Sequence, residues 1–444
     1  MVPVLTLAPL DAANAQRLSL IRDAEIESSI RAFVTPIWKA AGLNPDSVDV
    51  VIVQDNSLNA FVAGGQRIFV NTGLLMRTER PGQLIGVLAH ETGHIAGGHL
   101  ARQQEELRAL STLQILETIL AAGALAGSAA AGGSSGRGGP TGGSATNAPG
   151  SLVSFLQYTQ TQENSADQAA ITYLEKTRQS PKGSVEFLRI LAQRERMLLG
   201  RRDTYLTTHP LTQDRIAAYE EAAARSPYAN TPDSQRFIDL HGRLVAKLMG
   251  FIAPDQALQQ FREGDPSVIA RYARAIALYR KGALGSALLT LDGLLKEYPN
   301  DPYFHELRGQ ALFENGRAVE AVPSYRRAVQ LLPGTPLVKM DYARALLETT
   351  RPEDDREAIR NLEIASQTET ESFELWRLMS VGYARLNNHG MTSLARAEMA
   401  ILQGRRSEAQ AHAATAERQL TQGSPAWQRA QDIKAYISSR PAKR

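Results

Sequence analysis

The apolar positions in the first hundred residues predict a long helix, a few short strands and a second helix. Residues 20–45 carry Ile and Phe at helical spacing, which indicates an amphipathic helix. The β-branched run 48–53 predicts a mostly buried strand, and residues 59–62 and 67–70 predict a hairpin around a Gly-Gly turn. Helical spacing then continues from Gln83 to Leu100. We therefore expect an α+β domain that is mostly helical with a small sheet.

The middle of the chain has a different composition. Residues 121–150 are almost wholly Gly, Ala, Ser and Thr, so they cannot bury enough apolar surface to offset the entropy of ordering, and we expect a flexible loop. Helical spacing returns at Leu152. No run reaches the ~20 strongly apolar residues that span a bilayer, and we expect the nearest candidate, residues 113–131, to be soluble or interfacial. We hypothesise that residues 112–150 form a mobile flap or an element that touches a membrane.

The C-terminal third repeats with a period of 34 residues, which is typical of tetratricopeptide helix pairs. Four pairs of positions share that spacing: Gly282 and Gly316, Ala287 and Ala321, Pro299 and Pro333, Pro302 and Pro336. A third copy carries about three extra residues at Arg351, and a more divergent fourth copy includes Gly404. We expect residues 266–440 to form an all-α superhelical domain. Its concave surface suits the docking of a protein partner better than catalysis, and the alternative is an unspecialised helical bundle.

One motif in the second predicted helix indicates catalytic chemistry. His90 and His94 are four residues apart, so both imidazoles lie on one helical face and can bind a single Zn²⁺. Glu91 lies between them, where it can polarise a metal-bound water. The alternative is a pair of core histidines beside a surface glutamate. His99 is rotated off the ligand face, and we expect it to be packed or hydrogen-bonded.

A catalytic zinc needs a third protein ligand, and the chain has no cysteine to supply it. Glu163, on the next convincing helix, is the best candidate. Asp167 follows one turn later and could accept the free ring N–H of a zinc-bound histidine, the alternative being a solvated aspartate. His209 is held extended by Pro210, and Arg215 follows in the next helix. That segment either delivers both side chains to the zinc or is a capping loop with a surface arginine.

Charge and the N-terminus bear on partners and location. The net charge of +3, from 49 basic and 46 acidic residues, gives no support to nucleic-acid binding. Residues 2–10 are apolar and precede a small-x-small motif at residues 13–15, as at a signal-peptidase site. We therefore expect residues 1–15 to be the remnant of a signal peptide and the mature chain to be periplasmic. The alternatives are a disordered tail and a cytoplasmic zinc protein.

Three motifs together resemble the signatures of the gluzincin-type zinc metallopeptidase family that includes the CAAX prenyl endopeptidases and HtpX. They are HETGH at 90–94, ENSAD at 163–167 and THPLTQDRI at 208–216. The resemblance covers residues 16 to about 225 and, with the repeats, the whole chain resembles the periplasmic branch that carries them. It implies a zincin-like metallopeptidase domain, for which we take residues 16–250, and one Zn²⁺ per chain. The implied ligands are His90, His94 and Glu163, with Glu91 as the catalytic base.

The resemblance also implies that His209 and Arg215 lie at the cleft, where the histidine either caps the zinc in a resting state or helps to hold the oxyanion. The strand with Asn59, Ala60 and Phe61 is similar to the family's edge strand, along which a substrate peptide would lie. Gln160 to Gln162 depart from the family, which often has an arginine there.

From these features we expect a zinc metalloendopeptidase of the Gram-negative periplasm, soluble or peripherally attached to a membrane. Its substrates would be unfolded or misassembled envelope and outer-membrane proteins. Its repeats would dock those substrates or the outer-membrane assembly machinery. The competing hypothesis is a chaperone or adaptor for outer-membrane protein assembly whose metal site is normally closed.

Overall fold

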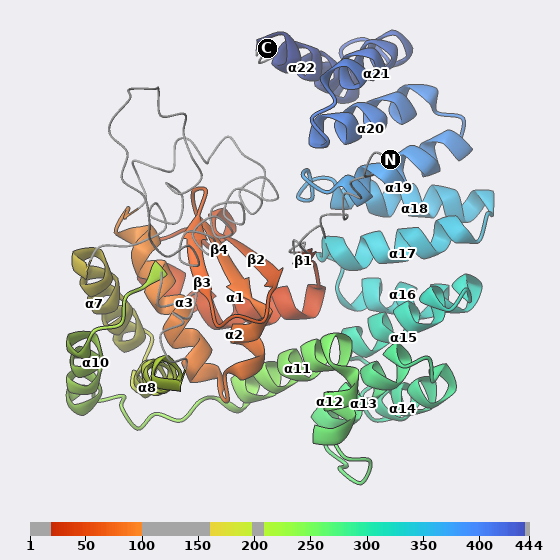
Figure 1. The fold of residues 1–444 in the computed structure, drawn as a ribbon. Coiled ribbons are helices and arrows are strands. Elements are labelled where there is room, and N and C mark those ends of the chain that lie inside the picture. Colours follow the sequence, from red (N-terminus) through yellow and green to blue (C-terminus); the bar gives the residue numbers. More distant parts are fainter. Residues whose placement is uncertain (1–18, 100–159, 198–207, 440–444) are drawn as a thin grey trace, which may run out of the picture. The chain divides into compact units, whose positions relative to one another are not determined.

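The computed structural model describes residues 19–99, 160–197 and 208–439 (Figure 1). The described residues form two compact units, one of residues 19–22, 30–99, 160–197 and 208–238 and the other of residues 23–29 and 239–439. The expectations for residues 1–15 and 112–150 fall outside the described residues. Within the described ranges, no helix is both long enough and apolar enough to cross a membrane.

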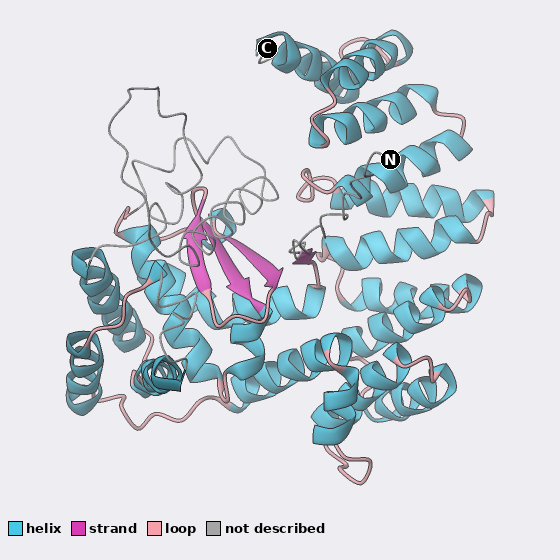
Figure 2. Cartoon of the chain, in the orientation of Figure 1, coloured by secondary structure: helices cyan, strands magenta, loops and turns pink. Residues whose placement is uncertain are grey.

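The first unit contains a four-stranded sheet with the order β1-β2-β4-β3 (Figure 2). Its strands are β1 (Ser19–Ile21), β2 (Asp49–Gln54), β3 (Ala60–Ala63) and β4 (Arg67–Asn71). The predicted hairpin is confirmed, since β3 and β4 pair antiparallel across Gly64 and Gly65, both of which have positive φ. Strand β2 pairs parallel with β4 and antiparallel with β1.

The prediction of a helix over residues 20–45 was wrong at both ends, since the helix also stops at Ala40. Residues 19–21 pair with residues 52–54 as β1, and helix α1 (Ala24–Ala40) begins only after Asp23. The Asp23 side chain accepts a hydrogen bond from the backbone N–H of Ile26 at 2.9 Å, which satisfies one of the free donors of the first turn. The apolar spacing continued through this cap and therefore did not mark the boundary.

Helix α3 (Pro81–Ala96) is the centre of the first unit and is buried along nearly its whole length. It packs against β3, and against α7 (Gln160–Lys176) and α8 (Lys182–Met197). Helix α10 (Gln213–Arg225) packs on α7 and α8, while α2 (Thr72–Arg77) contacts β2 and β4. Gly93 allows α3 and α7 to approach closely, because a Cβ there would lie 2.7 Å from the carbonyl oxygen of Ala166. The sheet and α7 are thus held on the helix that carries the HExxH motif.

The second unit is a series of helix pairs, which confirms the predicted class of fold. The helices are α11 (Gln235–Ile252), α12 (Pro254–Gln260), α13 (Val268–Arg280), α14 (Leu284–Glu297), α15 (Pro302–Glu314), α16 (Ala318–Leu331), α17 (Pro336–Glu348), α18 (Pro352–Ala365), α19 (Phe373–Arg385), α20 (His389–Leu402), α21 (Arg406–Gln419) and α22 (Pro425–Ser439). Gly282 and Gly316 have positive φ between paired helices. Thr350 between α17 and α18 and Asn387 between α19 and α20 take the same conformation, and Gly404 of the predicted fourth copy takes it between α20 and α21.

Buried charges tie residues 23–29 to the helices of the second unit. The Nζ atom of Lys247 lies 2.8 Å from Oδ2 of Asp23 and 3.3 Å from Oε2 of Glu25. The Nε atom of Arg243 lies 2.6 Å from Oε1 of Glu25, and the hydroxyl of Tyr272 donates to Oε2 of the same carboxylate at 2.6 Å. The start of α1 is therefore part of the packed core of this unit.

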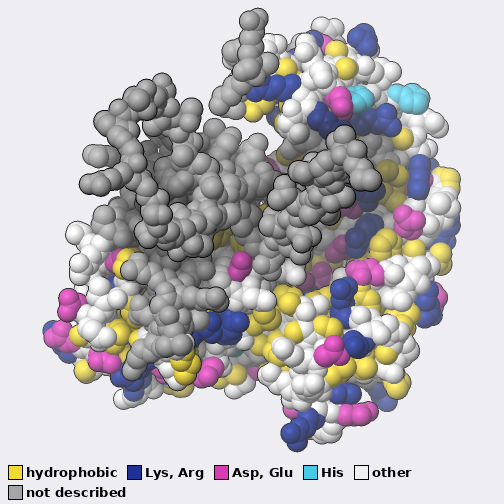
Figure 3. Space-filling model, viewed as in Figure 1, with side chains coloured by type: hydrophobic (Ala, Val, Ile, Leu, Met, Phe, Trp, Pro, Cys, Tyr) yellow, Lys and Arg dark blue, Asp and Glu magenta, His cyan; other side chains and the backbone are white. Residues whose placement is uncertain are grey.

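Basic and acidic side chains are interspersed on the part of the surface that Figure 3 colours by type.

Candidate metal centre

Helix α3 places the two histidines of the motif on one buried face. The Nε2 atoms of His90 and His94 lie 3.1 Å apart, and the rings meet at 81°. The helix can start at Pro81 because a first-turn residue needs no N–H. A separation of four residues then stacks the two side chains along the helix axis, so that both rings reach the same point.

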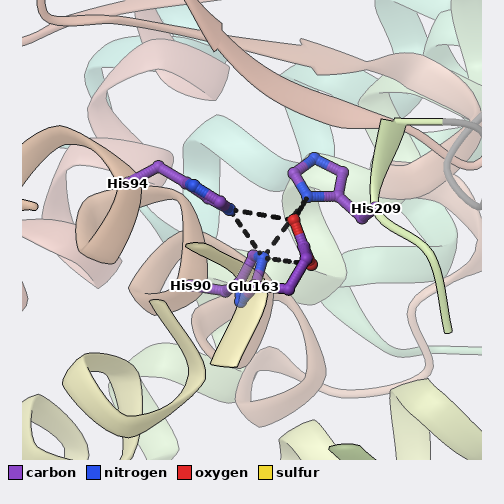
Figure 4. A group of neighbouring side chains, drawn as sticks. All are labelled: His90, His94, Glu163 and His209. Carbon is purple, nitrogen blue, oxygen red and sulfur yellow. Dashed lines mark hydrogen bonds and ion pairs between the residues drawn. The ribbon is translucent and has the colours of Figure 1, made fainter. Parts of the chain in front are cut away.

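Two more donors come from segments far away in the sequence (Figure 4). Glu163 lies in the first turn of α7, with Oε2 3.4 Å from Nε2 of His90 and Oε1 3.3 Å from Nε2 of His94. His209 lies before α10, where Pro210 disfavours a helical conformation. Its Nδ1 atom is 2.9 Å from Oε1 of Glu163 and 3.4 Å from Nε2 of His90. The structure thus brings together two histidines of one helix, a glutamate of a second helix and a histidine of a loop.

The spacing of these four donors fits a small cation. One donor atom from each residue lies within 4.8 Å of the others. The closest pairs are 2.9 to 3.4 Å apart, whereas donors placed tetrahedrally around zinc at ~2.0–2.1 Å would be separated by roughly 3.3–3.4 Å. Imidazole nitrogens and carboxylate oxygens are also the ligands that zinc takes where no thiolate is present. The donor set therefore suits a zinc ion, with Nδ1 of His209 in the fourth position.

Glu91 lies beside the donor set without being one of its members. Its side chain is fully buried, and neither carboxylate oxygen has a hydrogen-bond partner among the described residues. Nε2 of His209 lies 3.5 Å from its Oε1. Burial, the largest influence, raises the pKa of Glu91. A buried carboxylate in this state is costly to folding, and such groups are concentrated where a protein moves protons.

The buried carboxylate of Asp167 and the buried guanidinium of Arg215 contact the residues of the donor set. The Oδ1 atom of Asp167 lies 2.8 Å from Nδ1 of His90. Arg215 donates to both oxygens of Asp167, from Nε at 2.6 Å and from Nη2 at 3.0 Å. Its Nη1 atom donates to the carbonyl of Pro210 at 3.0 Å and lies 2.6 Å from Oε2 of Glu163. One side chain therefore links α10, two carboxylates of α7 and the segment before α10.

Comparison with known proteins decides which class of site this is. Residues 21–223 match the model of peptidase family M48, and residues 255–302, 272–336 and 307–368 match the tetratricopeptide repeat. The chain carries an M48 peptidase domain. It is a metalloprotease with C-terminal tetratricopeptide repeats, so the predicted family and class of enzyme are confirmed.

Similar proteins from three bacteria share one name. A beta-barrel assembly-enhancing protease of Yersinia pestis is 24% identical over 369 residues, which are 81% of this chain and 72% of that protein. The protease of the same name from Escherichia coli (strain K12) is 25% identical over 84% of this chain and 75% of its own length. A Vibrio cholerae protein that carries the name provisionally is 27% identical over 79% and 71% of the two lengths. These matches extend beyond the M48 domain into the repeats.

The charges around His90 favour a proton on its ring, which a cation bound at the donor set would replace. Burial lowers the pKa of His90, but the charges of Asp167 and Glu163 outweigh burial and raise it to about 10. Burial lowers the pKa of His94. Asp167 is also buried, yet the positive charge of His90 lowers its pKa to about 2. A proton on His90 thus balances the carboxylates, and a divalent cation would take its place, since metal ligands must be deprotonated.

The M48 domain places the three expected substrate-strand residues at one edge of the sheet. Ala60 and Phe61 belong to β3, which pairs only with β4 within the described part of the chain. The carbonyl of Asn59 accepts from the N–H of Asn71 at 2.9 Å, and the ring of Phe61 stacks on that of Phe69 at 4.9 Å. Strand β3 also packs on α3. Strand β3 is therefore held beside the helix of the motif by direct packing.

The hydrogen bonding of His99 was expected only in general terms. The structure places its Nδ1 atom 3.0 Å from Nδ1 of His94, and its backbone carbonyl accepts from the side chain of Gln162 at 3.0 Å. From its rotation on the helix, His99 was expected to be packed or hydrogen-bonded rather than a ligand, and no partner was named for it. The signal that it missed is the Gly97-Gly98 pair, which ends α3 and turns the chain back.

Proposed function

We propose that this metalloprotease is a zinc-dependent endopeptidase of the Gram-negative periplasm that degrades misassembled outer-membrane proteins. The observation that carries the proposal is the buried set of His90, His94 and Glu163 with the Glu91 carboxylate beside it. The names of the similar proteins, which refer to β-barrel assembly, support this substrate class and location. The tetratricopeptide repeats support a second role in docking substrates or the outer-membrane assembly machinery.

Three residues would hold one zinc ion per chain, and a fourth would move the proton. His90, His94 and Glu163 supply the ligands, and bound zinc would polarise the scissile carbonyl and lower the pKa of a water. Glu91 takes a proton from the attacking water and passes it to the leaving amine. Its raised pKa suits it to hold that proton between the two steps. Asp167 would keep His90 oriented through its contact with Nδ1, and Arg215 would keep Glu163 and Asp167 in place through its contacts with both carboxylates.

A substrate chain would lie along β3 in extended form. Main-chain groups of Asn59, Ala60 and Phe61 would pair with it in the manner of an added strand, which makes binding depend on backbone and extended conformation more than on side-chain identity. Folded proteins cannot present such a segment without local unfolding. This supports unfolded or misassembled chains as substrates.

The decisive experiment compares the zinc-loaded full chain with its Glu91→Gln variant on three substrates: casein, an unfolded outer-membrane β-barrel protein and the same barrel folded in detergent. We expect Glu91→Gln to bind zinc as the wild type does and to lose cleavage by at least ~10²-fold. Glu175→Gln, on an exposed position of α7, is the matched control and should cleave normally. Equal cleavage by wild type and Glu91→Gln would refute the proposed base, and preference for the folded barrel would refute the substrate class.

The position of His209 favours a second candidate function. Its Nδ1 atom lies within the donor set, 2.9 Å from Glu163, where a fourth ligand would exclude water. A site closed in this way would rarely cleave, and the chain would then act as a chaperone or adaptor for outer-membrane protein assembly. Aggregation assays on the unfolded barrel distinguish the two. Equal suppression by wild type and Glu91→Gln, with no cleavage by either, would favour the chaperone.

A further inference from the structure

The turn that ends α3 brings His99 back onto His94. Gly98 has a φ of +62°, its N–H donates to the carbonyl of Ile95 at 3.1 Å, and the N–H of His99 donates to the carbonyl of His94 at 3.2 Å. These two bonds and the left-handed glycine define a Schellman motif. In that motif the residue after the left-handed position packs its side chain on the residue five positions earlier, usually as an apolar contact. Here both residues are histidines.

The contact between them is polar and has a defined direction. The Nδ1 atoms of His94 and His99 are 3.0 Å apart, and the rings are nearly perpendicular at 78°. Nε2 of His94 is the atom that faces the other metal-binding side chains. A His94 that binds a cation therefore has no proton on Nε2 and must carry its proton on Nδ1. Nδ1 of His94 therefore donates, and Nδ1 of His99 accepts.

Two further features favour this orientation of His99. A Cβ at Gly97 would lie 2.4 Å from Nε2 of His99, so glycine leaves the space that the ring occupies. The backbone carbonyl of His99 accepts from Gln162, the residue before Glu163 on α7. The helix that supplies the third ligand thus also fixes the backbone of His99.

We propose that His99 is a positioning residue that fixes the tautomer and the ring orientation of His94 for zinc binding, an inference that rests on the proposed function. The two ligand histidines then have different partners: the anionic Asp167 for His90 at 2.8 Å, and the neutral acceptor His99 for His94. A carboxylate partner makes its histidine a stronger ligand than a neutral acceptor does. Zinc binding by His94 therefore depends more on the ring orientation that His99 fixes than on the charge of its partner.

The test is zinc affinity, measured by competition with a chromophoric chelator in the full chain, for His99→Ala, His99→Asn and His99→Gln. An Asn side chain carries its amide on Cγ and can place Oδ1 where Nδ1 of His99 lies, whereas Gln places its oxygen one bond further out. We expect a ~10–100-fold loss of affinity for Ala and Gln and a value within about threefold of the wild type for Asn, because loss of such a partner typically costs that much.

Several outcomes would overturn the role of His99. One is zinc affinity of His99→Ala and His99→Gln equal to that of the wild type, and another is an equal loss in all three variants, which would indicate packing rather than an acceptor. Melting temperatures of the metal-free proteins show whether each variant folds, and Gln, close in size to His, remains informative if Ala unfolds. A wild type that binds no zinc would refute the proposed metal centre itself, whereas zinc bound equally by all variants would refute only this inference.

Discussion

Replacement of Arg215 by Met should destabilise the first unit strongly in the metal-free protein. Arg215 is 2% exposed, and its guanidinium contacts Asp167 at 2.6 and 3.0 Å, Glu163 at 2.6 Å and the carbonyl of Pro210 at 3.0 Å. Met fills much of the same volume but leaves two buried carboxylates without their cation. Removal of one partner from a buried ion pair costs about 3–5 kcal/mol, which corresponds to a fall in melting temperature of roughly 6–20 °C for a domain of this size.

Calorimetry of the full chain, with hydrogen exchange on peptides from α7 and α10, would measure this loss and assign it to one unit. Excess zinc should restore part of the stability, because a bound cation compensates Glu163. Arg225→Met is the matched control: it lies on the same helix, its side chain is 72% exposed, and its ion pair with Glu221 should contribute under about 1 kcal/mol. If Arg215→Met melted like Arg225→Met, or exchange in α10 were unchanged, the guanidinium would not hold these segments together.

Two further predictions concern helix contact and pH. Gly93→Ala places a Cβ 2.7 and 2.9 Å from backbone atoms of Ala166, so it should push α7 away from α3 and weaken zinc binding. It should lower the free energy of unfolding by about 1–3 kcal/mol. The control is Gly285→Ala, which should not destabilise the protein because nothing lies within 4 Å of the added Cβ. In the metal-free protein, His90, with its pKa raised to about 10, contributes stability that is complete below pH ~6.5 and lost as the pH rises towards 10. Asp167, with its pKa lowered to about 2, contributes stability above pH ~3.8 that is lost as the pH falls towards 2. Melting temperatures should therefore decline on both sides of pH ~4–6.5, and a rise between pH 7 and 10 would contradict this account.

Local patterns were sufficient to predict the parts of the fold that depend on neighbours in sequence. The spacing of four residues between His90 and His94 specifies their common face, and the Gly64-Gly65 turn specifies the β3–β4 hairpin. The period of 34 residues likewise indicated the first helix pairs, because Gly282 and Gly316 occupy left-handed turns. In each case one short-range geometric rule fixes the structure.

Features that depend on distant segments were not accessible in the same way. The local pattern around Arg215 favoured a surface arginine, and only the approach of α10 to α7 shows that its guanidinium meets Asp167 and Glu163. The pairing of β1 with β2 was not predictable from local pattern either, because three residues carry too little periodicity. Contacts made between segments 46 to 119 positions apart, such as those of His209, need the tertiary structure.

The place of His209 leads to a last prediction, which separates the two roles that remained open for it. With Nδ1 2.9 Å from Oε1 of Glu163 and 3.4 Å from Nε2 of His90, the ring lies where a water would have to bind. If this arrangement is a cap whose release costs about 1.4 kcal/mol, only ~10% of molecules are open, and His209→Ala should raise kcat/KM on casein ~10-fold. Zinc should stay bound, because three ligands remain. The double variant His209→Ala/Glu91→Gln must be inactive if the gained cleavage arises at this site. A fall in kcat/KM for His209→Ala would instead assign the ring to the oxyanion and reject the cap, because removal of a group that acts only in the transition state slows the reaction.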